Sequence, residues 1–216
     1  VVSPGIPLPR GKLYASNITC LAAWCRRFDY DVQLSIVNDR FDEIEAVFSR
    51  LATETDAIIT SGGAWTGDHD LVARVLDHMD GRILFHRLRI GPGKATGMAM
   101  LAGIPVFILP GGPPSNLMGF LQIALPGLFM LSGAASSPLP RCKVRIREEL
   151  RTNSPSWTQF IYGRLTTDTN EEPPLFLPLK ANSRLRSMAE ATAVVSIAEG
   201  EAFIAANSVI SAQLLT

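Results

Sequence analysis

The feature that most constrains the fold is the stretch from Asp56 to Asp70, DAIITSGGAWTGDHD. A short apolar run ends there in small residues, and an acidic start leads into LVARVLDHM, whose apolar spacing is helical. A strand, a glycine-rich loop and a helix in this order are typical of an α/β protein whose loop binds a ligand. Gly62 and Gly63 let a ligand approach the backbone, because they have no Cβ. A purely structural role is about equally compatible, since many such loops carry glycine and an Asp N-cap.

The composition restricts the classes of partner. The chain has 216 residues, enough for one large domain or two small ones, and 20 Lys and Arg balance 20 Asp and Glu. This balance argues against nucleic-acid binding. No apolar run approaches the ~18 residues of a membrane span, and VVSPGIPLPRG lacks the features of a signal peptide. The chain does not begin with Met, so we expect a fragment of a longer protein. From the charge balance and the lack of a long apolar run, we expect neither nucleic-acid nor membrane partners.

The cysteines and histidines do not predict a metal site. Cys20, Cys25 and Cys142 are odd in number and poorly spaced for metal binding. We interpret them as small buried hydrophobic residues of a reducing, cytoplasmic compartment. The histidines are scattered along the chain, and His78 is expected on the surface of a helix.

The first two thirds of the chain alternate between strand and helix patterns. We expect strands at 32–37, 57–60 and 82–89 and a hairpin or strand pair at 98–101 and 104–109. Helices are expected at 16–28, 41–52 and 70–79 and from Ser115 or Asn116 to 131. Ser16 or Asn17 would cap the first helix, Ser115 or Asn116 would cap the last, and Pro126 would kink or break it. This alternation predicts βαβ units with a mostly parallel sheet.

Three loops fit the place where such sheets bind ligands, outside the carboxyl ends of the strands. They are residues 61–70, 91–97 and 110–116. The first loop contributes carboxylates, the second contributes the cation Lys94, and the third contributes rigid proline- and glycine-rich turns.

The pattern changes after the small-residue linker at 132–140. Arg141, Lys143, Arg145 and Arg147 alternate with apolar residues, as in a half-buried strand. This basic row could meet phosphate, but a solvated face that guards an edge strand is the favoured explanation. Short strand patterns follow, and residues 139–216 are expected to form a small β-barrel or sandwich.

The loops resemble those of the molybdopterin molybdenumtransferases, the MoeA/gephyrin family. TSGGAWTGDHD is similar to T-S-G-G-x-S-x-G-x-x-D, GPGKATG to K-P-G-K-P, and LPGGPPSN to L-P-G-N-P-x-S-x. The lead-in PLPRGKLYASN resembles P-L-x-x-G-x-I-x-D-S-N, and the stretch from SRLRSMAEA to ISAQLL resembles the family's C-terminal β domain. The resemblance covers nearly the whole chain in one order.

The resemblance implies a three-layer molybdopterin-binding α/β domain at 1–133 and a small all-β barrel domain at 138–216. In the family, a central strand precedes the part that this chain resembles, and two further domains lie N-terminal to it. We therefore expect the sheet to lack its first strand or to borrow one from another chain. The implied function is insertion of molybdenum, from molybdate, into adenylylated molybdopterin. The resemblance also implies that the AMP link is hydrolysed with the help of Mg²⁺ and that the protein is a homodimer, and we expect it in the cytoplasm.

The resemblance also implies the site residues. Asp70 and Lys94 would be catalytic, and Asp70 would also hold the metal. Trp65 could stack on the pterin, cap the apolar edge of the sheet, or fill space left by Ala15. The residues expected to bind molybdopterin are Ser61, Gly62, Gly63, Trp65, Gly67, Asp68, Pro92, Gly93, Pro110, Gly111 and Ser115.

Several family positions are substituted. The Asp of D-S-N is Ala15, the first Lys of K-P-G-K-P is Gly91, and the Asn of L-P-G-N-P is Gly112. The loop Ser is Trp65 and the last Pro of K-P-G-K-P is Ala95. Alanine and glycine do not replace a metal-binding carboxylate or an oxyanion-binding lysine. The alternative function is therefore a non-catalytic molybdopterin-binding or carrier module, and a dimerisation scaffold is a third, less favoured hypothesis.

Overall fold

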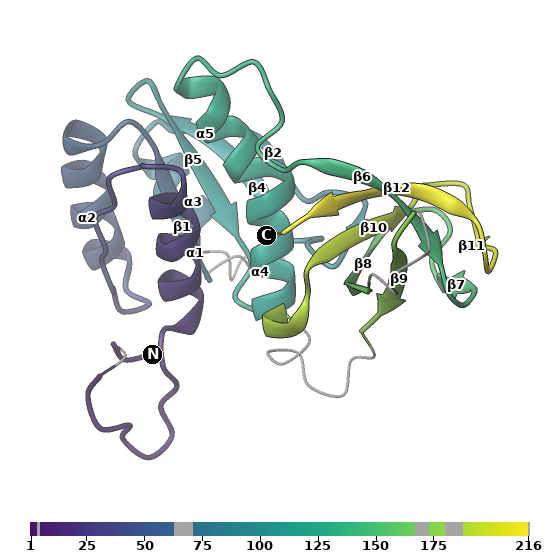
Figure 1. Ribbon diagram of the computed structural model, residues 1–216. Helices are drawn as coiled ribbons and strands as arrows, with labels where there is room; N and C mark the ends of the chain where they lie inside the picture. Colours follow the sequence, from purple (N-terminus) through teal and green to yellow (C-terminus); the bar gives the residue numbers. More distant parts are fainter. Residues whose placement is uncertain (4, 63–70, 167–172, 180–187, 216) are drawn as a thin grey trace. The chain divides into compact units, whose positions relative to one another are not determined.

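The computed structural model describes residues 1–3, 5–62, 71–166, 173–179 and 188–215 (Figure 1). The chain divides into two units. Residues 1–88 and 95–128 form the α/β unit, and residues 89–94 and 129–216 form the barrel unit. The short segment with Lys94 therefore belongs to the barrel unit, although its place in the sequence lies inside the predicted first domain.

The α/β unit contains a mixed sheet with the strand order β1-β5-β4-β2. The strands are β1 (Ile58–Ser61), β2 (Arg82–His86), β4 (Gly97–Leu101) and β5 (Ile104–Leu109). β1 and β5 are parallel, whereas β4 is antiparallel to both β5 and β2. The α/β class is confirmed, but the expectation of a mostly parallel sheet is wrong for the described strands. The turn at Ala102 and Gly103, both with positive φ, is too short for a parallel crossover and enforces a hairpin.

Three predicted helices are confirmed to within a few residues: α1 (Ser16–Arg27), α2 (Phe41–Glu54) and α3 (Leu71–His78). The predicted caps are wrong. Ala15 is the N-cap of α1 and Gly112 that of α4 (Pro113–Gly119), and neither makes a side-chain cap bond. The polar side chains of Asn17 and Asn116 bind other loops instead, as described below.

The predicted strand at 32–37 is also wrong, because no described strand pairs with this segment. Its polar side chains bind α2 instead: Arg50 donates to Gln33 Oε1 at 3.4 Å and to Ser35 Oγ at 3.2 Å. A pattern of alternating side chains forms a strand only where a neighbouring strand is available. Among the described strands, β1 pairs only with β5, so its second edge has no described partner.

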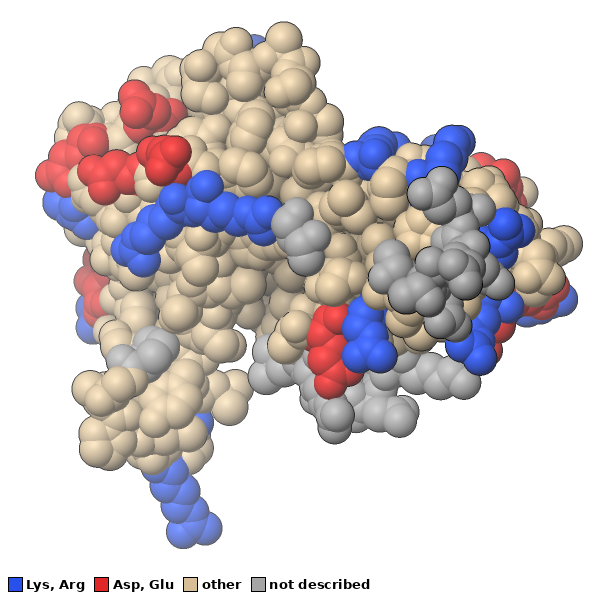
Figure 2. Space-filling model, in the orientation of Figure 1, with Lys and Arg blue, Asp and Glu red and all other residues tan. Residues whose placement is uncertain are grey.

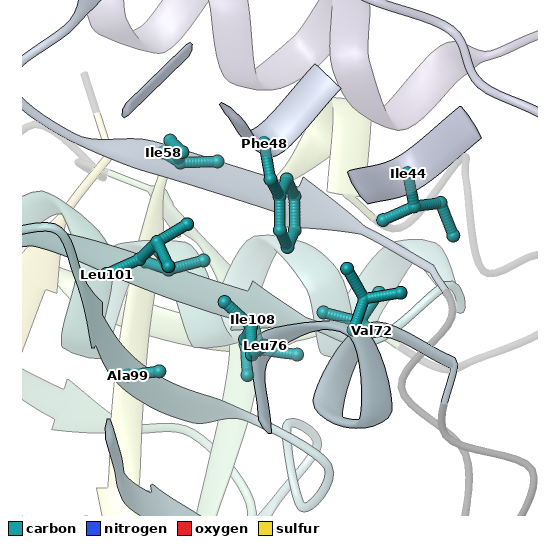
Figure 3. Packing of buried hydrophobic residues seen from close by; sticks show 10 residues of the cluster. Ile44, Phe48, Ile58, Val72, Leu76, Ala99, Leu101 and Ile108 are labelled. Carbon is teal, nitrogen blue, oxygen red and sulfur yellow. The ribbon is translucent and has the colours of Figure 1, made fainter. Parts of the chain in front are cut away.

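One hydrophobic core of the α/β unit lies between the sheet and the helices α2 and α3 (Figure 3). Figure 3 shows Phe48 of α2 extending toward the strands, with Ile58 and Ile108 nearby. Burying such a side chain stabilises the fold by roughly 1.5–3 kcal/mol. The cluster comprises Ile44, Phe48, Ile58, Val72, Val75, Leu76, Ala99, Leu101, Val106 and Ile108.

One helical run continues from α4 through the π-helical turn η2 (Phe120–Ala124) to α5 (Leu125–Leu131). Pro126 does not break it. The Leu125 N–H donates to Phe120 O five residues back, and this wide turn accommodates the proline that follows.

The run from Pro113 to Leu131 is also long and apolar enough to cross a membrane, with 19 residues and mean hydropathy 1.3. The expectation that no run approaches this length is therefore wrong. A core helix passes the same test, and Leu117, Phe120 and Leu121 are buried within the protein. Gly, Asn and Gln residues interrupt the apolar residues of this run, so its full length is not evident from the sequence.

The barrel unit confirms the predicted all-β barrel. Five strands run in the order β10-β12-β6-β9-β8, the pairing of β10 with β8 closes the ring, and β3 (Ile90–Gly91) joins β8. A small separate sheet pairs β7 (Leu150–Arg151) with β11 (Phe203–Ile204). The ring strands are β6 (Arg141–Ile146), β8 (Thr158–Thr166), β9 (Leu175–Pro178), β10 (Ala193–Ile197) and β12 (Val209–Leu214).

The basic row begins on β6, which pairs with β12 on one side and β9 on the other. The explanation that the row guards an edge strand is therefore wrong from Arg145 on, where β9 pairs with the second side of β6. On the face shown in Figure 2, Lys and Arg side chains of the barrel unit are interspersed with acidic and uncharged ones. Among the described residues, that face shows no continuous basic surface, which agrees with the balanced charge of the chain.

Candidate functional site

Two loops of the α/β unit meet at one edge of the sheet. Because β1 and β5 are parallel neighbours, their carboxyl ends lie side by side. The Gly62 N–H donates to Leu109 O at 3.0 Å and extends the pairing by one residue. A Cβ added to Gly111 would lie 3.5 Å from Gly62 Cα, so the loops after β1 and β5 run in van der Waals contact. Gly62 has φ +93°, a conformation that favours glycine.

Two asparagine amides fasten these loops together. Asn116, only 2% exposed, donates from Nδ2 to Pro110 O at 2.9 Å and to Ser61 Oγ at 3.0 Å. Asn17, in the first turn of α1, donates from Nδ2 to Gly111 O at 2.9 Å and to Ser61 Oγ at 3.1 Å. Each amide thus uses both of its N–H groups to join the two loops, and Asn17 also ties them to α1.

These two hydrogen bonds determine whether the Ser61 hydroxyl can donate or accept a further hydrogen bond. A hydroxyl oxygen can accept two hydrogen bonds and donate one. Ser61 Oγ already accepts from both Asn17 and Asn116, so only its O–H remains as a donor. Ser61 is exposed, and no described residue accepts from it. As far as the described residues go, the hydroxyl is therefore oriented and able to donate to an oxygen of a ligand, such as a phosphate or a carbonyl.

The start of α4 offers fewer donors than most helices do. Pro113 and Pro114 have no N–H, although the first turn of a helix normally presents free N–H groups to an anion. The Asn116 N–H donates to Gly112 O at 2.8 Å. Ser115, which is half-buried, is left with the first backbone N–H of the helix. An anion bound at the start of α4 would therefore depend on hydrogen bonds from side chains more than on backbone N–H groups.

Lys94 lies in the barrel unit, at the end of the segment that includes β3. Its Nζ lies 4.8 Å from the centre of the Trp157 ring. Gly93, the residue before it, has φ +116°, which favours glycine at this turn. Pro92 precedes this turn and is joined to Gly91 by a cis peptide bond. The Lys94 side chain is exposed, so its ammonium can meet an anion.

The structure brings together four predicted site residues, Ser61, Gly62, Pro110 and Gly111, and places Ser115 in the first turn of the following helix. Pro92, Gly93 and Lys94 belong to the barrel unit. Predicted residues that lie outside the described part of the chain are Gly63, Trp65, Gly67, Asp68 and Asp70.

Sequence reasoning missed Asn17 and Asn116 as site residues. Each stands at the end of a matched family motif, ASN or PPSN, where we interpreted it only as a possible helix cap. A hydrogen bond across loops far apart in the sequence leaves no periodic pattern. Its one trace is an asparagine within a family motif.

A metal site is not formed by the described residues. They include no cluster of three or more His, Cys, Asp or Glu side chains suited to a metal ion. The loops around Ser61 offer amide and hydroxyl groups, and position 15 is alanine. Mg²⁺ prefers carboxylates and water as ligands, so these residues do not fit it by themselves. Burial raises the pKa of the Cys25 and Cys20 thiols, which favours the neutral thiol over a metal-binding thiolate.

Comparisons with known proteins agree with this geometry. The family described as "Probable molybdopterin binding domain" matches residues 1–129. Molybdopterin molybdenumtransferase 2 of Mycobacterium tuberculosis is 30% identical over 96% of this chain and 52% of its own length. The molybdopterin molybdenumtransferase of Nostoc is 28% identical over 92% of this chain and 47% of its own length.

A solved structure shares the fold across both units. The molybdopterin biosynthesis MoeA protein from Pyrococcus horikosii matches with TM-score 0.83 and 25% identity, over 100% of this chain and 51% of the other. The chain spans about half the length of the curated relatives it matches. The matched family, the curated relatives and the shared fold agree with each other, and the chain belongs to the molybdopterin-binding family of the molybdopterin molybdenumtransferase (MoeA) type.

Proposed function

We propose that this protein acts in molybdenum cofactor biosynthesis by binding adenylylated molybdopterin and inserting molybdenum from molybdate. One observation carries the proposal: the Ser61 hydroxyl, held by two amides at the carboxyl ends of β1 and β5, is available only as a donor. The phosphates of adenylylated molybdopterin present acceptor oxygens of the kind that this donor suits. The molybdenumtransferase names of the relatives support the reaction.

The residues take distinct roles in this proposal. The Ser61 hydroxyl donates to a ligand oxygen, while Gly62 and Gly111 let the ligand approach the backbone closely. Lys94 contributes a positive point charge toward phosphate or molybdate. Asp70 is proposed as the catalytic carboxylate in hydrolysis of the AMP link. It is also proposed as a ligand for Mg²⁺.

A second candidate is a non-catalytic molybdopterin-binding module. It is favoured by the environment of Gly91, where the family has a lysine. A Cβ added to Gly91 would lie 2.9 Å from Gln159 Oε1, so a side chain at this position would require the end of the Gln159 side chain to move. Compared with the family's site residues, Gly91 lacks the lysine's positive charge and Ala15 lacks the aspartate's carboxylate. Loss of these two groups would weaken catalysis more than binding.

Molybdate-dependent release of AMP distinguishes the two candidates. Purified protein is incubated with adenylylated molybdopterin and Mg²⁺, molybdate is added last, and AMP is measured. The transferase proposal predicts release only after molybdate is added, and restored cofactor in a transferase-deficient strain. Tight binding without release would identify a binding module. Neither binding nor restored cofactor would refute both.

Assembly and location are further proposals. We propose a homodimer, on the strength of the family resemblance, and a location in the cytoplasm, on the strength of the odd number of cysteines and their free thiols. Light scattering of the purified protein tests the dimer directly.

A further inference from the structure

The segment that carries Lys94 is attached along the start of β8. The Thr158 N–H donates to Arg89 O at 3.0 Å, and Gln159 Nε2 donates to Gly91 O at 2.7 Å. β3 pairs in parallel with β8, with Ile90 opposite Thr158. Two consecutive residues of β8 thus hold the backbone of this segment.

A second contact holds the beginning of the segment. Arg89 Nη2 lies 3.0 Å from Glu199 Oε1. Gly91 is close to Gln159 because it lacks a side chain, and Gly93 makes a turn that favours glycine. These contacts hold the backbone of residues 89–91 in place, and Lys94 follows the turn at Gly93.

The side chain of Lys94 has a different kind of support. Its four-carbon stem is flexible, and an ammonium on such a stem loses rotamer freedom when it binds. Among the described residues, no carboxylate lies within ion-pairing distance of Lys94. Within the described part of the chain, its Nζ lies 4.8 Å from the centre of the Trp157 ring, and Trp157 directly precedes the two residues that hold the backbone.

The face of an indole ring attracts a cation more strongly than the other aromatic rings do. An ammonium on that face keeps N–H donors directed away from the ring, because it has three of them. Trp157 can therefore restrain Lys94 without competing for the oxyanion, whereas a carboxylate partner would neutralise the charge that the anion needs.

We propose that Trp157 is a positioning residue, which holds the Lys94 ammonium in place for a phosphate of the substrate. This role rests on the proposed function, because it assumes that Lys94 binds such an anion. Trp157 acts only through Lys94 and does not itself contact the reacting atoms.

The contact is tested without any substrate. Lysines labelled with ¹³C at Cε are followed by NMR, and Lys94→Arg identifies the Lys94 signal among those of Lys12, Lys143 and Lys180. The ring current of Trp157 should shift the Lys94 signal upfield. Trp157→Leu should abolish this shift, and Trp157→Phe should keep part of it. An unshifted Lys94 signal in the wild-type protein would overturn the proposal.

The role is tested by titrating adenylylated molybdopterin into the same variants. At an exposed site, a cation–π contact is worth enough to predict about a two- to five-fold loss of affinity in Trp157→Leu. Trp157→Phe should lose less, which also shows that the barrel tolerates substitution there. In a Lys94→Ala background, Trp157→Leu should have no further effect.

The outcomes separate the two proposals. Wild-type affinity in Trp157→Leu, or an equal loss in the Lys94→Ala background, would overturn the positioning role alone. Absence of binding by the wild-type protein would overturn the proposed function and this role together.

Discussion

The two units hold their candidate binding groups in different ways. In the α/β unit, Asn17 and Asn116 fix an uncharged hydroxyl between two loops that are in contact, and each amide N–H has an acceptor. In the barrel unit, a charged group extends from a segment paired with β8 and rests on one aromatic ring. The first arrangement depends on close packing and loses a buried hydrogen bond when disturbed. The second tolerates change better, because an exposed cation can rehydrate.

The largest effect we predict is on the core of the barrel. Phe176 is fully buried, so Phe176→Ala should destabilise the barrel unit by about 3–5 kcal/mol. Hydrogen exchange of the β8 and β10 amides measures this loss, and Ile108→Ala is the matched change in the α/β unit. If Phe176→Ala left the barrel amides as protected as before, the closed barrel would not depend on this core.

A second prediction concerns overpacking beside the same ring. A Cβ added to Gly163 would lie 2.1 Å from Phe176 Cζ and 2.8 Å from Leu177 O. Gly163→Ala should therefore destabilise the protein by about 1–3 kcal/mol, measured by urea unfolding. Gly112→Ala is the control, because its φ of −72° suits alanine and nothing lies within 4 Å of the added Cβ. Equal stability of the two variants would contradict the packing described for β8 and β9.

The third prediction addresses the fastened loops. Asn116→Ala should cost about 1–3 kcal/mol, because it leaves the Pro110 carbonyl without its amide donor in a buried setting. Asn17→Ala, at a half-buried position, should cost about 0.5–1.5 kcal/mol. Thermal unfolding measures both. A larger loss in Asn17→Ala would mean that α1, rather than α4, organises the loops.

The smallest prediction concerns a surface charge remote from both sites. The hydrogen bond from the Arg40 guanidinium lowers the pKa of the Asp42 carboxyl. A lowered folded-state pKa contributes stability above the unfolded value of about 4, and this contribution is lost as pH falls through the folded value. Asp42→Asn should thus lower Tm slightly at pH 7, and by less at an acidic pH such as 2.5. An equal decrease at both values would assign the effect to something other than this ionisation.

The sequence predicted what depends on local periodicity. The apolar stripe from Phe41 to Leu51 located α2, and the paired apolar runs around Gly103 located the β4–β5 hairpin. The strand expected at 32–37 was wrong, because strand formation depends on a neighbour that periodicity does not reveal. For the same reason, only the closed ring of pairings showed that β6 is not an edge strand.

The site was predictable only at the level of its loops. Ser61 and Gly111 were identified from motifs, but the amides that connect them come from positions interpreted as caps. Trp157 carried no motif at all, and its contact with Lys94 follows from the pairing of β3 with β8. Side-chain contacts between distant segments are a property of the folded chain and not of any single stretch.

The central claim is that the Ser61 hydroxyl donates to an oxygen of the substrate, and one titration tests it most directly. Adenylylated molybdopterin is titrated calorimetrically into the wild-type protein, Ser61→Ala and the control Ser49→Ala, which alters an exposed serine of α2. A hydrogen bond to a charged oxygen predicts a loss of affinity of about ten- to a hundred-fold in Ser61→Ala and none in the control. Equal affinity of Ser61→Ala and the wild-type protein would contradict the account.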